Sequence, residues 1–198
     1  MPTTHLLYLH GFRSSPLSAK AKKMAAVVQQ RHPTVRWWCP QLPPSPSAAM
    51  ALIMDGIAGW PQDADVECMA VVGSSLGGFY ATAVAEQFRC KAVLLNPAVD
   101  PARDLARHIG EQTTWQNPYE HFIFEPVFID ELHALYTGPL RAPSNYLAVI
   151  AKGDEVLDWQ EMAARYAGAR LELLECGDHA LSDFDTHVPL ILDFLRLA

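Results

Sequence analysis

The chain has 198 residues, of which 50% are hydrophobic and 19% are charged, and this composition suits one globular domain with a single core. Its formal net charge of −7 argues against nucleic acid or an anionic membrane as a partner, because both attract basic surfaces. No apolar stretch approaches the roughly 20 residues that span a bilayer, and the first ten residues lack the basic segment of a signal peptide. We therefore expect a cytoplasmic protein that does not enter membranes.

Apolar runs alternate with segments of helical periodicity along the chain. In chain order we expect a strand at 6–9, a helix at 16–31, a strand at 35–39, a helix at 48–59 capped by Ser47, a strand at 66–72, a helix at 76–88, a strand at 92–95, a helix at 101–108, a strand at 146–150, a helix at 158–167, a strand at 171–174 and a helix at 184–196. Continuous apolar strands that alternate with helices imply a parallel sheet covered on both faces. The sequence thus predicts one α/β domain over residues 1–198, with a mostly parallel sheet of about six strands flanked by helices.

One region interrupts this alternation. Between Pro97 and Pro143 no strand is predicted, and the segment is longer than a normal crossover. We expect a small helical cap around 98–143 over the edge of the sheet, with extra packing for the core as the alternative. The segment is rich in aromatic residues, namely Trp115, Tyr119, Phe122, Phe124, Phe128 and Tyr136.

The cysteines are scattered and sit beside apolar or strand-like residues. No two of them form a C-x-x-C pair, which argues against a zinc site. We expect buried free thiols in a reducing compartment and no bound metal. The residues concerned are Cys39, Cys68, Cys90 and Cys176.

The motif with the clearest chemistry is Gly73-Ser74-Ser75-Leu76-Gly77, at the junction of a predicted strand and a predicted helix. It fits G-x-S-x-G, a strained turn that presents a nucleophilic serine above the sheet. Glycines two residues away on each side let the strand and the helix pass close together, and only Ser75 has both. The N–H of Leu76 would then face a developing oxyanion at the start of the helix.

A nucleophilic serine needs a base and an acid that orients the base. In this type of enzyme both follow the serine, the acid first and the histidine second, just past the ends of strands. His179 follows the last predicted strand, and Asp154 follows the strand before it. Asp178 adjoins His179 and is expected to form a turn instead. Other acids near strand ends remain open as alternatives to Asp154, namely Glu155, Asp158 and Asp100.

The turn after the first strand, Leu9-His10-Gly11-Phe12, is the expected source of a second oxyanion donor. Gly11 lets the backbone turn so that the N–H of Phe12 faces the oxyanion, the alternative being a plain strand-to-helix turn. His10, Gly11 and Arg13 are candidate substrate-binding residues. Arg13 either meets an anionic group of the substrate or is a solvated surface arginine.

Several short stretches match a known family in order along nearly the whole chain. They are L-L-Y-L-H-G-F at 6–12, S-S-P at 14–16, S-A-K-A at 18–21, P-Q-L-P-P at 40–44, V-G-S-S-L-G-G at 72–78, N-P-A-V at 96–99, N-P-Y at 117–119, G-D-E-V-L-D at 153–158 and H-A at 179–180. On these motifs the chain resembles the YqiA-like bacterial esterases, a small branch of the α/β-hydrolases. The resemblance implies an α/β-hydrolase fold without early antiparallel strands, and esterase activity on acyl esters and acyl-CoA thioesters. It carries Ser75, Asp154 and His179 into the catalytic triad, while Asp178 stands where the family has asparagine.

Together these features predict a serine hydrolase that cleaves carboxylic esters through a Ser-His-Asp triad and an acyl-enzyme intermediate, without a cofactor. Its partner would be a small-molecule acyl ester or thioester, and no pattern in the chain specifies an oligomeric state. An acyl-CoA thioesterase would use the same triad. Two further alternatives are a cofactor-free haloperoxidase and a catalytically silent binding protein, although silent proteins usually lack a triad residue and none is missing here.

Overall fold

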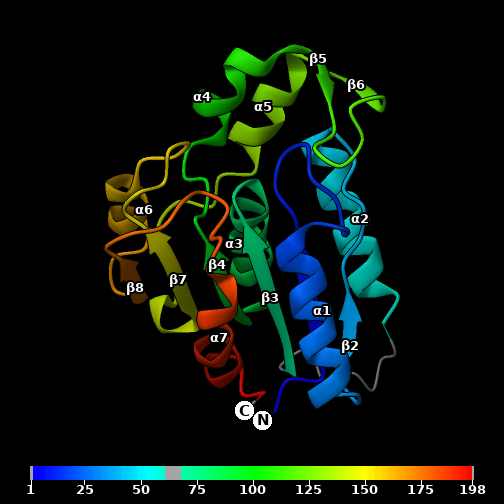
Figure 1. The fold of residues 1–198 in the computed structure, drawn as a ribbon. Coiled ribbons are helices and arrows are strands. Elements are labelled where there is room, and N and C mark those ends of the chain that lie inside the picture. Colours follow the sequence, from blue (N-terminus) through cyan, green and yellow to red (C-terminus); the bar gives the residue numbers. More distant parts are fainter. Residues whose placement is uncertain (1, 61–67, 198) are drawn as a thin grey trace.

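A six-stranded sheet lies at the centre of the computed structural model, which describes residues 2–60 and 68–197 (Figure 1). The strand order is β2-β1-β3-β4-β7-β8, and each neighbouring pair runs parallel. This arrangement confirms the predicted parallel α/β sheet. The strands are β1 (His5–Leu9), β2 (Arg36–Trp38), β3 (Met69–Ser74), β4 (Lys91–Leu95), β7 (Tyr146–Ala151) and β8 (Arg170–Leu174).

Helices cover both faces of this sheet, so alternate residues of each strand enter two separate cores. In β1, Leu6 and Tyr8 pack in the core that α1 and α7 complete, whereas Leu7 and Leu9 pack in the core that α2, α3 and α6 complete. Both faces are therefore apolar, which explains why the strands read as continuous apolar runs. The helices are α1 (Ala19–Arg31), α2 (Pro46–Ala58), α3 (Leu76–Phe88), α4 (Pro101–Leu105), α5 (Val127–Ala134), α6 (Trp159–Arg165) and α7 (Val188–Phe194).

The predicted cap region lies beyond the carboxyl ends of the strands, at the top of Figure 1. It contains α4 and α5, and it also contains an antiparallel hairpin of β5 (Gly110–Thr113) and β6 (His121–Phe124). The expectation that this region holds no strand is therefore wrong. The first strand of this hairpin, Gly-Glu-Gln-Thr, has no apolar alternation that would have predicted it. The strand is instead tied to the loop after β1, because Arg13 donates a hydrogen bond to the carbonyl oxygen of Thr113.

Two element boundaries differ from the sequence predictions at prolines. Ser45, and not Ser47, caps α2, because Pro46 takes the first helical position and the Ser45 Oγ accepts a hydrogen bond from the N–H of Ala48 at 3.1 Å. The predicted closing helix is split by His187 into a short 3-10 turn, η4 (Phe184–Thr186), and α7. Pro189 has no N–H to bond to the preceding turn, which explains the break.

The predicted strand at 66–72 corresponds to β3, which begins at Met69 and extends to Ser74; residues 66 and 67 lie outside the described residues. The helix predicted at 16–31 begins at Ala19. The helix predicted at 101–108 is α4 followed by a 3-10 turn, η2 (Ala106–His108), and a further 3-10 turn, η3 (Pro143–Asn145), precedes β7.

All four cysteines are free thiols, as expected, but they are not all buried. Cys68 and Cys90 are buried, and burial raises the pKa of Cys90 to about 12. Cys39 is half-buried, and Cys176 is exposed because it follows β8 at the edge of the sheet. The prediction of burial is thus wrong for Cys176.

Two further observations concern metal binding and membrane spans within the described ranges. Within residues 2–60 and 68–197, no three His, Cys, Asp or Glu side chains gather in a way that could hold a metal ion. None of the helices in this part of the chain combines the length and the apolarity needed to cross a bilayer.

Candidate active site

Ser75 occupies a sharp turn between β3 and α3, with φ of 55° and ψ of −123°. This conformation is strained for a residue with a side chain, and such strain concentrates at functional sites. The turn is compact because glycines flank it: a Cβ on Gly73 would lie 2.2 Å from the carbonyl oxygen of Gly77, and a Cβ on Gly77 would lie 2.0 Å from that of Leu9. The close approach of β1, β3 and α3 thus requires glycine at both positions.

His179 and Asp154 form a direct side-chain pair, with 2.7 Å between Nδ1 of the histidine and Oδ2 of the aspartate. The Asp154 carboxylate is fully buried, and its Oδ1 accepts hydrogen bonds from the N–H groups of Val156 and Leu157, both at 2.8 Å. Because a carboxylate can only accept, Nδ1 of His179 carries a proton and donates it to Oδ2. The aspartate therefore orients the ring and leaves Nε2 outside this pair.

The alternative acids are held elsewhere. Glu155 accepts a hydrogen bond from the backbone N–H of His179 at 2.9 Å, so it supports the histidine loop and does not orient the ring. Asp158 caps α6. Asp178 accepts from both the N–H and the hydroxyl of Ser182, which is the turn expected for it.

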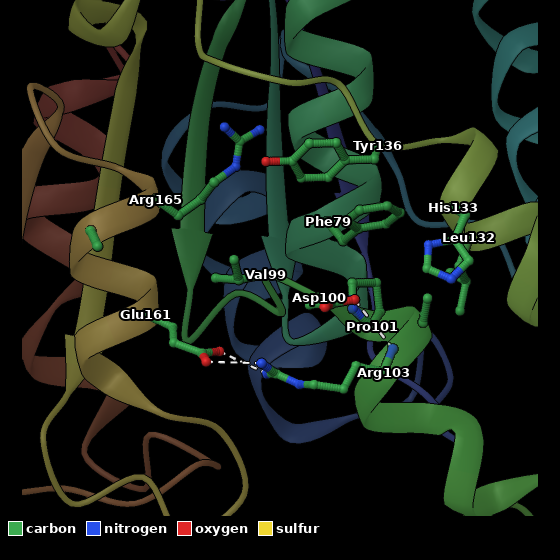
Figure 2. A pocket seen from close by; sticks show the side chains of 12 residues that line it. Phe79, Val99, Asp100, Pro101, Arg103, Leu132, His133, Tyr136, Glu161 and Arg165 are labelled. Carbon is green, nitrogen blue, oxygen red and sulfur yellow. Dashed lines mark hydrogen bonds and ion pairs between the residues drawn. The ribbon is translucent and has the colours of Figure 1, made fainter.

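Asp100 lies in a different cavity, which has a volume of about 610 Å³ and is lined by neither Ser75 nor His179. Figure 2 shows the Asp100 carboxylate turned toward the backbone N–H of Arg103, with which it caps α4 at 3.2 Å. The Arg103 side chain makes a bidentate ion pair with Glu161 across this cavity, at 2.8 and 2.7 Å. Asp100 is therefore not placed to orient His179.

Ser75 and His179 meet at one cavity of about 500 Å³, here called the Ser75 cavity. Residues from the loop after β1, the loop after β7 and the cap region complete its wall. Apolar and charged side chains are mixed in this wall, which consists of Phe12, Arg13, Ser75, Leu76, Asp104, Leu105, Arg107, His108, Trp115, Glu155, Val156, Leu157, His179 and Ala180.

The two residues that are expected to supply oxyanion donors also line the Ser75 cavity. Among the described residues, the backbone N–H groups of Phe12 and Leu76 have no hydrogen-bond partner, and both residues line the cavity. Gly11 brings the loop after β1 against Ser75, because a Cβ built on Gly11 would lie 3.2 Å from the Cβ of Ser75 and 3.6 Å from its Oγ. Two unpartnered N–H donors beside a strained serine form a site suited to a developing negative charge.

His10 is buried and bonds only to the protein. Its Nδ1 lies 3.0 Å from the carbonyl oxygen of Gly11, and its Nε2 accepts from the N–H of Leu42 at 3.1 Å. This pattern assigns a neutral ring with the proton on Nδ1. His10 therefore holds the loop at 40–44 against the loop after β1, and neither of its ring nitrogens is free to bind a substrate.

Acidification is expected to destabilise the fold through His10. Burial lowers the pKa of His10 below its ordinary value of 6.5, so the unfolded chain binds more protons at this ring as the pH falls below 6.5. The stabilisation by the neutral ring is complete above that value and is lost as the pH falls through the folded pKa. Urea unfolding between about pH 8 and about pH 5 should show a steeper loss of unfolding free energy for the wild type than for His10→Gln. Equal slopes would contradict this expectation.

Arg13 ties the loop after β1 to the cap region. Its Nε donates to the carbonyl oxygen of Thr113 at 2.5 Å, a terminal nitrogen donates to Thr113 Oγ1 at 2.8 Å, and the guanidinium lies 4.2 Å above the ring of Trp115. Trp115 in turn donates from its indole N–H to the carbonyl oxygen of Phe12 at 3.3 Å. Arg13 is therefore not a solvated surface residue, and its bonds to Thr113 occupy part of the guanidinium that would bind an anion.

Asn96 is a residue to which the sequence analysis assigned no role in the site. Its fully buried amide donates to the carbonyl oxygens of Asp178 and His179, at 3.0 and 3.2 Å, and accepts from the N–H of Ala151 at 2.8 Å. One side chain therefore joins the histidine loop to the strand that leads to Asp154. The available signal was Asn followed by proline at a strand end, because asparagine tolerates the positive φ of 42° found here.

Comparison with solved structures shows that the fold is that of the α/β-hydrolases. The α/β-hydrolase domain-containing protein 10 from mouse matches with a TM-score of 0.72 at 15% identity, over 98% of this chain and 91% of that chain. Est1E from Butyrivibrio proteoclasticus with bound ferulic acid matches with a TM-score of 0.67 at 14% identity, over 98% and 87%. A structure reported for the metagenome-derived lipolytic enzymes LipS and LipT matches with a TM-score of 0.65 at 16% identity, over 100% and 96%.

Within this class, the chain belongs to the uncharacterised protein family UPF0227, whose family model matches residues 5–196. This is the YqiA family, so the resemblance found in the sequence motifs is confirmed.

Proposed function

We propose that this protein is a serine hydrolase that cleaves small-molecule carboxylic esters, with Ser75 as nucleophile, His179 as base and Asp154 as the orienting acid. The observation that carries the proposal is the 2.7 Å bond between His179 and the buried Asp154 carboxylate, with the same histidine lining one cavity with Ser75. An aspartate that fixes the ring tautomer leaves Nε2 free to take a proton from a serine hydroxyl. The match to a structure reported for metagenome-derived lipolytic enzymes supports ester hydrolysis as the class of reaction.

The proposed reaction has two halves. Nε2 of His179 takes the proton of Ser75 as Oγ attacks the acyl carbonyl, and Asp154 stabilises the imidazolium that forms. The N–H groups of Phe12 and Leu76 bind the oxyanion; loss of one such donor typically costs about 10²–10³ in rate. The imidazolium then protonates the leaving group, and an acyl-enzyme remains on Ser75. Water, deprotonated by the same histidine, hydrolyses it and restores the serine.

A thioester would react through the same groups, because only the leaving atom differs. A panel that pairs each acyl group as an oxygen ester and as a sulfur ester separates the two preferences by their kcat/KM values. A catalytically silent binding protein is disfavoured because serine, histidine and aspartate are all present and two of them are already bonded.

The first test is covalent labelling of the purified protein with a fluorophosphonate probe, read by intact mass. We expect a single adduct on the wild type and none on Ser75→Ala or His179→Ala, since the probe traps only an activated serine. Ser74→Ala is the matched control: Ser74 adjoins the nucleophile but is buried at the end of β3, so this variant should label like the wild type. A folded wild type without an adduct, or an adduct that persists in Ser75→Ala, would overturn the proposal.

A further inference from the structure

A second cavity adjoins the candidate active site on the side away from His179. Its volume is about 510 Å³, and it lies among the loop after β1, the proline-rich loop at 40–44, α2 and the β5–β6 hairpin. We call it the α2-side cavity. Its wall includes Gly11, Phe12, Arg13, Gln41, Leu52 and Leu76.

The two cavities share the residues that carry the oxyanion donors. Phe12 and Leu76 line both of them, whereas Ser75 and His179 line only the Ser75 cavity. Gly11, which belongs to the wall of the α2-side cavity, lies beside the proposed nucleophile, because a Cβ on Gly11 would lie 3.6 Å from the Oγ of Ser75. A carbonyl carbon attached to Ser75 would thus stand between the two cavities.

The chemistry of the reaction assigns a different part of the substrate to each side. In the tetrahedral intermediate the carbonyl carbon bears the Oγ of Ser75, the oxyanion, the leaving group and the acyl chain. The oxyanion faces the N–H groups of Phe12 and Leu76, and the leaving group must lie within reach of His179, which protonates it. The leaving group therefore occupies the Ser75 cavity, and the acyl chain takes the remaining direction, away from His179.

The α2-side cavity also has the surface that an apolar chain needs. Its main polar side chains already bond to the protein: both nitrogens of His10 are occupied, Arg13 is bound to Thr113, and the amide of Gln41 lies 3.4 Å from the carbonyl oxygens of Ser14 and Leu42. Of the other polar side chains in this wall, Glu120 accepts a hydrogen bond from the Thr114 hydroxyl at 3.3 Å, and His121 pairs with Glu111 at 2.8 Å. The larger part of the surface left for a ligand is apolar, and it comes from Leu42, Pro43, Pro44, Leu52, Tyr80 and Phe122.

Leu52 marks this surface most clearly. It is an aliphatic side chain of α2 that remains 39% exposed while it lines the cavity. The wall of the Ser75 cavity combines apolar side chains with the charged side chains of Asp104, Arg107 and Glu155, and these charged groups suit a polar leaving group. Burial of each further methylene of an alkyl chain is favourable, so an apolar cavity favours a longer acyl chain.

On the basis of the proposed function, we propose that the α2-side cavity is the acyl-chain site, that it binds apolar acyl chains, and that Leu52 is a specificity-determining residue. The leaving group then leaves through the Ser75 cavity.

The test compares p-nitrophenyl acetate with p-nitrophenyl octanoate, which share a leaving group and differ only in the acyl chain. Leu52→Trp should lower kcat/KM for the octanoate by about tenfold or more and change that for the acetate by less than about twofold. Leu52→Glu should also lower kcat/KM for the octanoate, because a charged side chain disfavours an apolar chain beside it. Agreement between the two variants would show that the effect does not depend on the bulk of tryptophan. Leu17→Trp is the matched control, because Leu17 is 65% exposed and lines neither cavity, and its ratio of octanoate to acetate activity should equal that of the wild type.

The same experiment separates failure of the acyl site from failure of the proposed function. Unchanged octanoate-to-acetate ratios in both Leu52 variants, with Ser75 still labelled by the fluorophosphonate, would overturn the acyl site alone. A loss of the chain-length preference in Val156→Trp, which fills the Ser75 cavity, would move the chain to that cavity and also overturn the assignment. Absence of both an adduct and ester hydrolysis in the wild type would overturn the two proposals together.

Discussion

Asp154→Asn is expected to lower kcat for ester hydrolysis by about 10⁴-fold, the size of loss found when the histidine of such a triad takes the wrong tautomer. The reason lies in the two oxygens of this carboxylate. Oδ1 accepts two backbone N–H groups, from Val156 and Leu157, so the asparagine must keep its oxygen there. Its NH₂ group then faces Nδ1 of His179, which has to become an acceptor, and the ring proton moves to Nε2. A histidine with the proton on Nε2 cannot take one from Ser75.

The matched control for this prediction is Asp158→Asn. Asp158 belongs to the same loop and caps α6, a position where asparagine serves as well as aspartate, so its kcat should stay within about twofold of the wild type. The measurement is steady-state hydrolysis of a p-nitrophenyl ester by both variants, with circular dichroism to verify folding. If Asp154→Asn keeps wild-type activity, or if Asp158→Asn or Glu155→Gln shows the large loss instead, the acid is assigned to the wrong residue.

Gly77→Ala is expected to reduce the free energy of unfolding by about 3 kcal/mol or more, or to prevent folding altogether. The added methyl group would lie 2.0 Å from the oxygen and 2.5 Å from the carbonyl carbon of Leu9, which are backbone atoms of β1. Neither atom belongs to a flexible side chain, so α3 and β1 would have to separate. The separation would also move the loop that carries the N–H of Phe12, and the activity of any folded fraction should fall with it.

Gly59→Ala provides the control for this second prediction. Gly59 ends α2 with φ of −77°, and a Cβ there would have its nearest neighbour at 3.4 Å, an ordinary contact. Urea unfolding should place this variant within about 0.5 kcal/mol of the wild type. A Gly77→Ala protein as stable as Gly59→Ala would contradict this prediction, because it would show that the turn at Ser75 tolerates a methyl group beside Leu9.

Asn96 shows why part of the site escaped the sequence analysis. Its amide bonds to carbonyl oxygens 82 and 83 positions away and to an N–H 55 positions away. No local pattern specifies such partners, since they become neighbours only because β4 and β7 lie side by side with β8 beyond them. The hairpin has the same origin: β5 is held by Arg13, which is 100 positions away, and not by its own apolar pattern.

The sequence by itself determined the features that depend on neighbouring residues. Short apolar runs and helical periodicity specified the alternating strands and helices. The glycine spacing around Ser75 specified the sharp turn between β3 and α3, because steric limits act within a few residues. The tertiary structure decided which of four carboxylates meets His179, where Asn96 bonds, and that the cap region contains a hairpin. These outcomes depend on the strand order and on contacts between distant loops, and such contacts leave no periodic signal in the chain.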